Sequence, residues 1–387
     1  MTSTVPLKRV TRMAYGSSLA SDMRIDGEFP VVGSGGISGT HTARNFRAPG
    51  IVVGRKGSYG SIHWLPTGGF AIDTAYYIDE RLTSADLRWL YYVLQAVDLK
   101  GPSQDVGVPG LAREAAYEVP VPTPPPLEEQ RRTAGFLDAE TSRIDRLMAK
   151  MCSQDELLSS RRRAVLAATW HPEVRVARLG YFLNLVTSGP RGWGEYIGSE
   201  GNMFFRSANL WRDSTEPKLA SVAYVDPPPS ALAESIRSTI RSGDVLVGIT
   251  GANTGWVCLA NQDVVGANVS QHVCLLRPSR LVSGKWLAYL LSSPLIQDSL
   301  LGSQYGGTKT QLSLPDLRDL KVPIPDLRTQ QSVADEIQHQ IIAIENERGA
   351  RARQLALLAE RRQALITAAV TGQLDVTTAR PAPDRDL

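Results

Sequence analysis

The chain has 387 residues, with 42 Lys and Arg against 39 Asp and Glu and a formal net charge of +3. The apolar share of 42% and the charged share of 21% are typical of a globular protein with sizeable cores, and the length indicates two or three domains. The near-neutral balance excludes a polybasic protein that coats nucleic acid indiscriminately, so any DNA contact must come from locally placed charge.

Cysteine usage and the absence of apolar runs exclude several further classes. Cys152, Cys258 and Cys274 are widely spaced and form no CxxC pair, which argues against a disulfide framework and against a zinc site. The N-terminal segment MTSTVPLKRV lacks the apolar core of a signal peptide, and no run of about 18 apolar residues occurs. A cytoplasmic protein without a metal is expected.

Residues 1–124 are predicted to form a globular domain of mixed α and β structure. An apolar run at Ile51–Val53 is followed by Gly54, Gly57 and Gly60, which predicts a strand, a glycine-rich turn and a second strand. A helical stretch, SADLRWLYYVLQAV, comes later, and the segment ends in VPVP.

Residues 125–170 are predicted to form one long helix that begins after a proline run. Apolar residues recur every seven positions along it, and a sustained seven-residue period indicates a coiled-coil seam. The seam residues are Leu137, Ile144, Met148, Met151, Leu158 and Val165.

Residues 171–324 are predicted to form a second mixed α and β domain with the same order of elements. The apolar run Val245–Val247 is followed by Gly248, Gly251 and Gly255. A helical stretch, GKWLAYLLSSPLIQDSLL, follows, and the segment ends in VPIP.

Residues 325–376 are predicted to form a second long helix, with Asp326 as its N-cap. Residues 377–387 are Pro-rich and charged, which predicts a disordered tail. The seam residues of this helix are Ile337, Ile341, Ile344, Leu355, Leu358 and Leu365.

The two helices are copies of one another. Residues 125–170 laid on 325–370 match without a gap at twelve positions, among them Gln130/Gln330 and Arg162/Arg362. Because the seams share one register, we expect the helices to pack together, although each could instead pack separately on its own domain. In a parallel pair the two arginines would lie side by side and repel, so an antiparallel pair is expected. The expected fold class is therefore α+β, with two mixed α/β domains, an antiparallel coiled coil and an internal repeat of about 200 residues.

Several segments are similar to catalytic motifs, but each lacks a residue that the motif requires. VDPPPS at 225–230 is similar to an amino-methyltransferase signature, but Pro229 stands where an aromatic ring would stack on a flipped base. Gly284-Lys285 is followed by Trp286, so no phosphate-binding ATPase loop is present. The five histidines form no HExxH motif. No catalytic residue is expected.

The helix entries carry a family resemblance. PPPLEEQRR at 124–132 and PIPDLRTQQ at 323–331, together with FPVVGSGGISGTH and VVGRKGSYGSI in the first domain, resemble the specificity (S) subunit of type I restriction–modification systems. The second entry departs from the usual Pro-Leu-x-Glu-Gln pattern, because Thr329 stands in place of Glu.

The resemblance implies a DNA-recognition subunit with two target recognition domains, 1–124 and 171–324. Each would read one half of a bipartite, asymmetric site in double-stranded DNA. The spacer helices, 125–170 and 325–376, would act as a ruler and dock two methyltransferase (M) subunits, with restriction (R) subunits as further partners. The chain itself would be non-catalytic and hold no cofactor, because S-adenosylmethionine, ATP and Mg would be bound by the partners. Helices of about 40 residues are roughly 60 Å long, which exceeds one duplex turn of about 34 Å.

Candidate DNA contacts are polar side chains in glycine-rich or polar loops, where Asn and Gln can pair with adenine and Arg or Lys with guanine or phosphate. The alternative for the first glycine-rich loop is a solvated hairpin, and for His41 a local hydrogen bond. Asn268 is instead predicted to end a strand or form a turn. The candidates are Arg55, Lys56, Ser58, Tyr59 and His41 in the first domain and Arg206, Asn209, Thr250, Asn253, Thr254, Gln271, Lys309 and Gln311 in the second.

Two other functions remain open at this point. The chain could be a non-catalytic coiled-coil scaffold whose globular domains bind protein or small ligands. It could also be a self-sufficient methyltransferase or nuclease, which the incomplete motifs disfavour.

Overall fold

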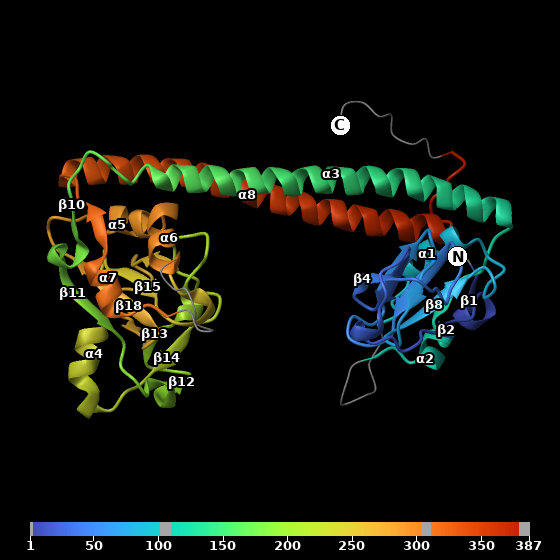
Figure 1. The fold of residues 1–387 in the computed structure, drawn as a ribbon, viewed down its shortest axis with the longest axis horizontal. Helices are drawn as coiled ribbons and strands as arrows, with labels where there is room; N and C mark the ends of the chain where they lie inside the picture. Colours follow the sequence, from blue (N-terminus) through green and yellow to red (C-terminus); the bar gives the residue numbers. More distant parts are fainter. Residues whose placement is uncertain (1–2, 101–109, 303–310, 379–387) are drawn as a thin grey trace. The chain divides into compact units, whose positions relative to one another are not determined.

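The computed structural model describes residues 3–100, 110–302 and 311–378. The chain divides into two compact units, Met1–Ser153 with Arg351–Leu387 (unit 1) and Gln154–Ala350 (unit 2). Each unit contains one globular head and parts of both long helices, α3 (Leu127–Ala167) and α8 (Leu327–Val370) (Figure 1). The mixed α/β fold class predicted from the sequence is confirmed.

The head of unit 1 is built on an antiparallel sheet of order β2-β8-β5-β6 and a smaller sheet of order β4-β3-β7, in which β3 and β7 are parallel. The central strand β5 is buried along its whole length, which confirms the strand predicted at Ile51–Val53. The strands are β2 (Ala14–Tyr15), β3 (Phe29–Gly33), β4 (Gly36–His41), β5 (Gly50–Gly54), β6 (Ile62–Leu65), β7 (Phe70–Ala71) and β8 (Ala75–Asp79).

The head of unit 2 repeats this plan, with an antiparallel sheet of order β11-β18-β15-β16 and a smaller sheet of order β12-β14-β13-β17. Its central strand β15 is again fully buried, as the apolar run Val245–Val247 predicts. The strands are β11 (Leu183–Ser188), β12 (Ile197–Gly198), β13 (Asn202–Phe205), β14 (Ala223–Val225), β15 (Val245–Gly248), β16 (Val257–Leu259), β17 (Asn268–Val269) and β18 (Val273–Pro278).

A short antiparallel strand pair closes each head at the point where its long helix begins. In unit 1, β1 (Thr4–Pro6) pairs with β9 (Pro120–Pro122), and in unit 2, β10 (Val176–Arg178) pairs with β19 (Lys321–Pro323). The VPVP and VPIP segments are therefore the last strand of each head, and they bring the start and end of that head together.

The short helices are also repeated, with one difference from the sequence prediction. Trp89 in α1 and Trp286 in α5 are fully buried at the third position of their helices. The helical stretch predicted from Gly284 onward is split in two, because Pro294 cannot donate a helical hydrogen bond and starts a new helix instead. The helices are α1 (Leu87–Ala96), α2 (Arg113–Glu118), α4 (Leu232–Ser238), α5 (Gly284–Leu291), α6 (Pro294–Gly302) and α7 (Leu314–Asp319).

One continuous core joins the head to the helix pair in each unit. In unit 1 it includes Ile51 of the sheet, Trp89 of α1, Leu137 of α3 and Ile366 of α8. In unit 2 the corresponding core runs from β15 through α5 to both long helices. Because the apolar face of the helix pair packs against the head, the two cannot separate without exposing that core to water.

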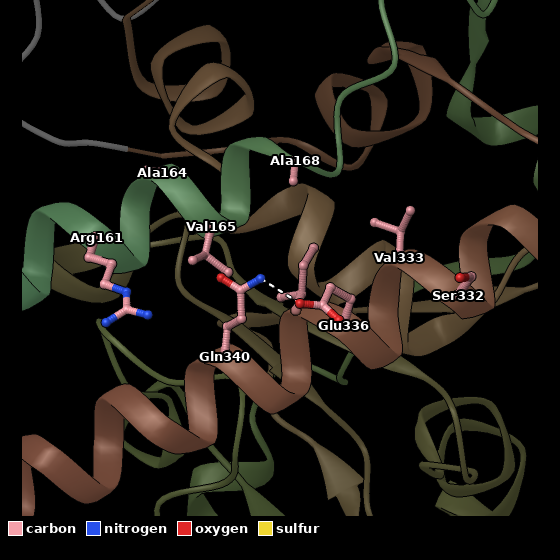
Figure 2. Close-up of a pocket in the computed structure, with 9 residues that line it drawn as sticks. Arg161, Ala164, Val165, Ala168, Ser332, Val333, Glu336 and Gln340 are labelled. Carbon is pink, nitrogen blue, oxygen red and sulfur yellow. Dashed lines mark hydrogen bonds between the residues drawn. The ribbon is translucent and has the colours of Figure 1, made fainter.

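The two long helices are antiparallel in each unit, as predicted. In unit 1, Arg362 Nε lies 2.9 Å from Asp145 Oδ1. In unit 2, Arg162 Nε lies 3.9 Å from Glu345 Oε1, the pair that the 200-residue repeat relates to the first. Figure 2 shows the end of α3 beside the beginning of α8 in unit 2.

All twelve predicted seam residues are buried or half-buried. The five with the least exposure come from both helices, and Arg162 is buried beside them at 7% exposure. The five are Leu137, Ile144, Leu158, Ile337 and Ile344, and the half-buried members are Met148, Met151, Val165, Ile341, Leu355, Leu358 and Leu365.

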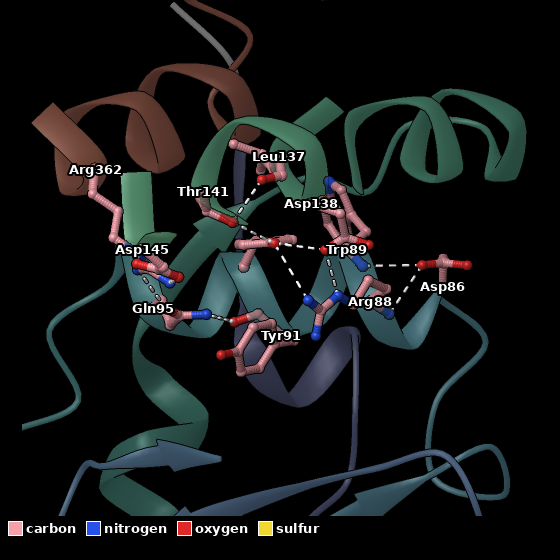
Figure 3. A network of polar contacts seen from close by, with 11 residues as sticks. Asp86, Arg88, Trp89, Tyr91, Gln95, Leu137, Asp138, Thr141, Asp145 and Arg362 are labelled. Carbon is pink, nitrogen blue, oxygen red and sulfur yellow. Dashed lines mark hydrogen bonds and ion pairs between the residues drawn. The ribbon is translucent and has the colours of Figure 1, made fainter. Parts of the chain in front are cut away.

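A polar network holds α1 against α3 in unit 1 (Figure 3). Asp138 accepts hydrogen bonds from Arg88 Nε and from the Tyr92 hydroxyl, each at 2.6 Å. The Arg88 guanidinium also lies over the Trp64 ring, 4.7 Å from its centroid. Burial, with the Asp138 contact adding to it, raises the pKa of Tyr92 to about 12. In unit 2, Lys285 of α5 replaces this arginine.

The ends of α8 show one agreement and one difference. Thr329 N–H donates to Asp326 Oδ1 at 3.0 Å, which confirms the predicted N-cap. The helix was predicted to reach residue 376 but ends at Val370, because Gly372 adopts φ 70° and the Leu374 N–H turns back to Ala368. Residues 379–387 of the predicted tail lie outside the described residues.

Candidate nucleic-acid interface

The first glycine-rich loop leaves the central strand of unit 1 through a defined backbone frame. The N–H groups of Arg55 and Lys56 both donate to the Thr74 carbonyl, at 2.8 and 3.1 Å. On the other side, Leu111 N–H donates to Arg55 O at 2.8 Å, and Lys56 forms a bridge with Gly110. Backbone hydrogen bonds therefore hold Arg55 and Lys56 from both sides where β5 ends, and the Lys56 side chain stays exposed.

Unit 2 contains the same frame with different residues. Ile249 N–H donates to His272 O at 3.0 Å, and Leu312 N–H donates to Ile249 O at 2.9 Å. Thr250 forms a bridge with Gln311, as Lys56 does with Gly110. Lys56 and Thr250 thus occupy equivalent places at the exits of β5 and β15, although their local sequences differ.

The side chains at the exit of β5 divide into exposed and packed ones. Lys56 and Ser58 are exposed, whereas Tyr59 is half-buried and packs against the core of unit 1. Arg55 is half-buried, with its guanidinium 5.1 Å from the centroid of the Tyr15 ring and a hydrogen bond to Asp73 O. Two exposed polar side chains and one anchored guanidinium can meet phosphates and base edges, and Tyr59 holds the loop in place.

At the exit of β15 a compact polar cluster comes together. Thr250 Oγ1 lies 2.7 Å from His272 Nδ1, and Gln271 Nε2 lies 3.1 Å from His272 Nε2. Gln271, His272 and Gln311 are all exposed, and Thr250 is half-buried. Three of these were predicted from the sequence, whereas His272 was missed. Its position directly after Gln271 in a polar loop was the available signal.

Two predicted DNA contacts are corrected by the structure. Asn209 is 2% exposed, and its amide accepts from Arg206 N–H and donates to the carbonyls of Lys218 and Ser221. Thr254 is 5% exposed, and its hydroxyl donates to Gly251 O. Burial and satisfied hydrogen bonds keep both side chains from solvent, so in this structure they hold loops together and present no exposed polar group.

The remaining candidates lie away from the ends of β5 and β15 or make hydrogen bonds within the protein. Asn253 is half-buried and donates to Ser207 O at 2.8 Å, and Arg206 is half-buried with its Nε buried and unpaired. His41 Nδ1 accepts from Ile25 N–H at 3.2 Å, and the ring packs edge-on against Phe70. His41 therefore makes a local hydrogen bond, which was its alternative role. Lys309 lies outside the described residues.

Asn268, predicted as a strand-end residue, begins β17. It is fully buried, and its amide donates to Ser235 O and Ser238 Oγ. This placement confirms a structural role.

Two features are absent from the part of the chain that the structure describes. No group of three or more His, Cys, Asp or Glu side chains in residues 3–100, 110–302 and 311–378 could hold a metal ion. Within the same ranges, no helix is long and apolar enough to span a membrane.

Comparisons with known proteins give a consistent result. A family model for the type I restriction modification DNA specificity domain matches residues 233–355. The type I restriction enzyme EcoBI specificity subunit of Escherichia coli is 22% identical over 316 residues, which are 74% of this chain. The match spans 66% of that relative, just under two thirds of its length.

A solved structure has the same fold over almost the whole chain. It comes from work on complex assembly and conformational transition of the type I R-M system, with 18% identity and a TM-score of 0.71. The likeness covers 96% of this chain and 98% of the other. Residues 233–355 therefore match the type I restriction modification DNA specificity domain, and the chain as a whole has the fold of this solved structure.

Proposed function

We propose that this chain is the sequence-specific DNA-recognition subunit of a type I restriction–modification complex. Residues 1–124 and 171–324 would be its two target recognition domains, each reading one half of a bipartite, asymmetric site. The observation that carries this proposal is the shared frame at the exits of β5 and β15, which presents Lys56 in one head and Thr250 in the other.

The chemistry of the two exits supports two different half-sites. A lysine contacts phosphate or guanine, whereas clustered amide, hydroxyl and imidazole groups pair with the edges of bases. One frame bearing two different sets of groups would read two different sequences. The spacer helices α3 and α8 would set the distance between the half-sites and dock two methyltransferase subunits.

We further propose that the chain has no catalysis of its own. Methylation with S-adenosylmethionine and ATP-driven cleavage would belong to the methyltransferase and restriction subunits. Methylation of DNA by the purified chain alone would contradict this part of the proposal.

Footprinting of the chain reconstituted with its methyltransferase subunit tests the main proposal. We expect two protected segments of different sequence separated by an unprotected spacer. A complex that assembles but protects no bipartite site would instead favour a coiled-coil scaffold whose heads bind protein or small ligands.

A further inference from the structure

The antiparallel helices of unit 2 leave a groove open between them. It has a volume of about 530 Å³ and is lined by the last turns of α3 and the first turns of α8 (Figure 2). Val165, Val333 and Ile337 give it an apolar surface, and Arg161 and Glu336 bring opposite charges to it. Gln340 Nε2 donates to Glu336 Oε1 at 2.7 Å.

The 200-residue repeat identifies the counterpart of this groove in unit 1. Unit 2 contains the end of α3 and the beginning of α8, whereas unit 1 contains the beginning of α3 and the end of α8. Each residue that lines the groove therefore has a counterpart 200 positions away in the sequence. Phe136 stands where unit 2 has Glu336, and Leu365 stands where it has Val165. Both larger side chains pack against the core of unit 1.

The segment that follows α8 adds two further apolar side chains to the core of unit 1. Leu374 and Val376 pack against the same core. Thr133 is 4% exposed, whereas its counterpart Val333 is only half-buried. At these positions unit 1 thus has larger apolar side chains that pack against its core, whereas their smaller or charged counterparts in unit 2 line an open groove.

We infer that the open groove receives an apolar side chain of phenylalanine size from the methyltransferase subunit that docks on unit 2. Phe136 is the template, since it occupies the corresponding place in the repeat. A buried aromatic anchor in a preformed pocket is the usual centre of a protein interface. This inference rests on the proposed function, because that function supplies the partner.

The inference makes the two docking sites unequal. In unit 1 the anchor is part of the chain, and in unit 2 the partner must supply it. A substitution that fills the groove should therefore weaken the docking of one methyltransferase subunit and leave the other in place.

The test uses the full chain, the purified methyltransferase subunit and native mass spectrometry with titration calorimetry. Glu336→Phe reproduces the residue at position 136 and fills the groove from α8. Ala168→Trp fills it from the residue that follows α3, which guards against a local rearrangement in the first variant. Glu360→Phe makes the same chemical change at an exposed position of α8 outside the groove. Thermal unfolding of each variant verifies its fold.

We expect both filling variants to weaken one of the two docking events at least tenfold, while Glu360→Phe binds like the wild type. Unchanged docking in both folded filling variants would overturn the groove assignment alone. A wild-type chain that binds no methyltransferase would contradict the proposed function itself. Self-association of the wild type that Glu336→Phe abolishes would identify a second copy as the occupant and overturn the assignment to a methyltransferase.

Discussion

Gln130 and Gln330, 200 residues apart in the sequence, make matching hydrogen bonds in the two units. Each Oε1 accepts from a backbone N–H at the start of a head helix, Asp86 in unit 1 and Ser283 in unit 2, both at 2.8 Å. Each Nε2 donates to the carbonyl oxygen of the proline five residues earlier. Both side chains are buried, at 3% and 0% exposure, so one amide joins the head, the helix entry and the long helix in each unit.

Removing this amide should destabilise the unit that contains it. Gln330→Ala would leave buried backbone groups without partners, at a cost of about 1–3 kcal/mol. The free energy of unfolding in urea measures this loss. Gln331→Ala, at an exposed neighbour, is the control and should change it by less than about 0.5 kcal/mol. Equal effects of the two substitutions would contradict the role given to Gln330.

The two repeat-related ion pairs should respond differently to loss of their arginine. Arg162 Nε and Glu345 Oε1, which lie 3.9 Å apart, are both buried without a hydrogen bond, whereas the Glu345 side chain as a whole is 42% exposed. Burial lowers the pKa of Arg162, which reflects the cost of holding its charge there. Arg162→Met should therefore leave the free energy of unfolding unchanged or raise it, because the desolvation cost is relieved.

Arg362→Met, the matched substitution in unit 1, removes a shorter contact with Asp145. It should lower the free energy of unfolding by about 0.2–1 kcal/mol, as for an exposed pair. Urea denaturation of both variants under one set of conditions makes the comparison. A larger loss from Arg162→Met would show that the buried arginine stabilises its helix pair.

Lys56→Ala should weaken DNA binding and reduce the slope of log Kobs against log salt by about one unit. The reason is that an exposed lysine at a strand exit can neutralise one phosphate. Fluorescence anisotropy across a salt series measures the slope, and Lys321→Ala, an exposed lysine on β19, serves as the control. An unchanged slope for Lys56→Ala would mean that this loop does not touch DNA.

His272→Ala should relax recognition in one half of the site only. The imidazole lies within hydrogen-bond distance of both Thr250 and Gln271, so its loss removes a contact from each of these two side chains. Sequencing of methylated sites in cells carrying the variant complex gives the altered positions, and His339→Ala, on the exposed side of α8, is the control. Changes in both half-sites would contradict the assignment of one half to each head.

Alkaline pH should destabilise unit 2 through its buried thiols. Burial raises the pKa of Cys274 to about 12 and also raises the pKa of Cys258. The folded thiol thus keeps its proton where the unfolded thiol, with a pKa of about 8.5, loses it. Its contribution is fully present below the unfolded pKa and is lost as pH rises from there towards 12.

Urea denaturation between pH 8 and 10.5 tests this dependence. The free energy of unfolding should fall with pH, and less steeply in Cys274→Ala, which has no thiol at that position. Parallel slopes for the two proteins would contradict the buried-thiol explanation.

Local patterns predicted the elements whose causes are local. The seven-residue period of α3 and α8, the apolar runs of β5 and β15 and the Asp326 cap all depend on neighbours within a few residues. The split at Pro294 and the end of α8 before Gly372 also have local signals. The antiparallel packing could be predicted because Arg162 and Arg362 recur at one position of the repeat.

Which polar side chains reach a ligand depends on contacts between distant segments. Asn209 and Thr250 both stand in polar loops, but hydrogen bonds to Lys218 and Ser221 bury the first, whereas the bridge to Gln311 holds the second at a strand exit. The position of His272 after Gln271 marks it as a loop residue, but its contact with Thr250, 22 residues away, depends on the tertiary structure.

The repeat, the two heads and their long helices could be predicted from periodicity and turn residues along the chain. The folded chain was needed to show which candidates face outward, how Gln130 and Gln330 join each head to its helix, and that the helix pair of unit 2 has an open groove. These features depend on burial and on hydrogen bonds between segments that fold together from far apart in the chain.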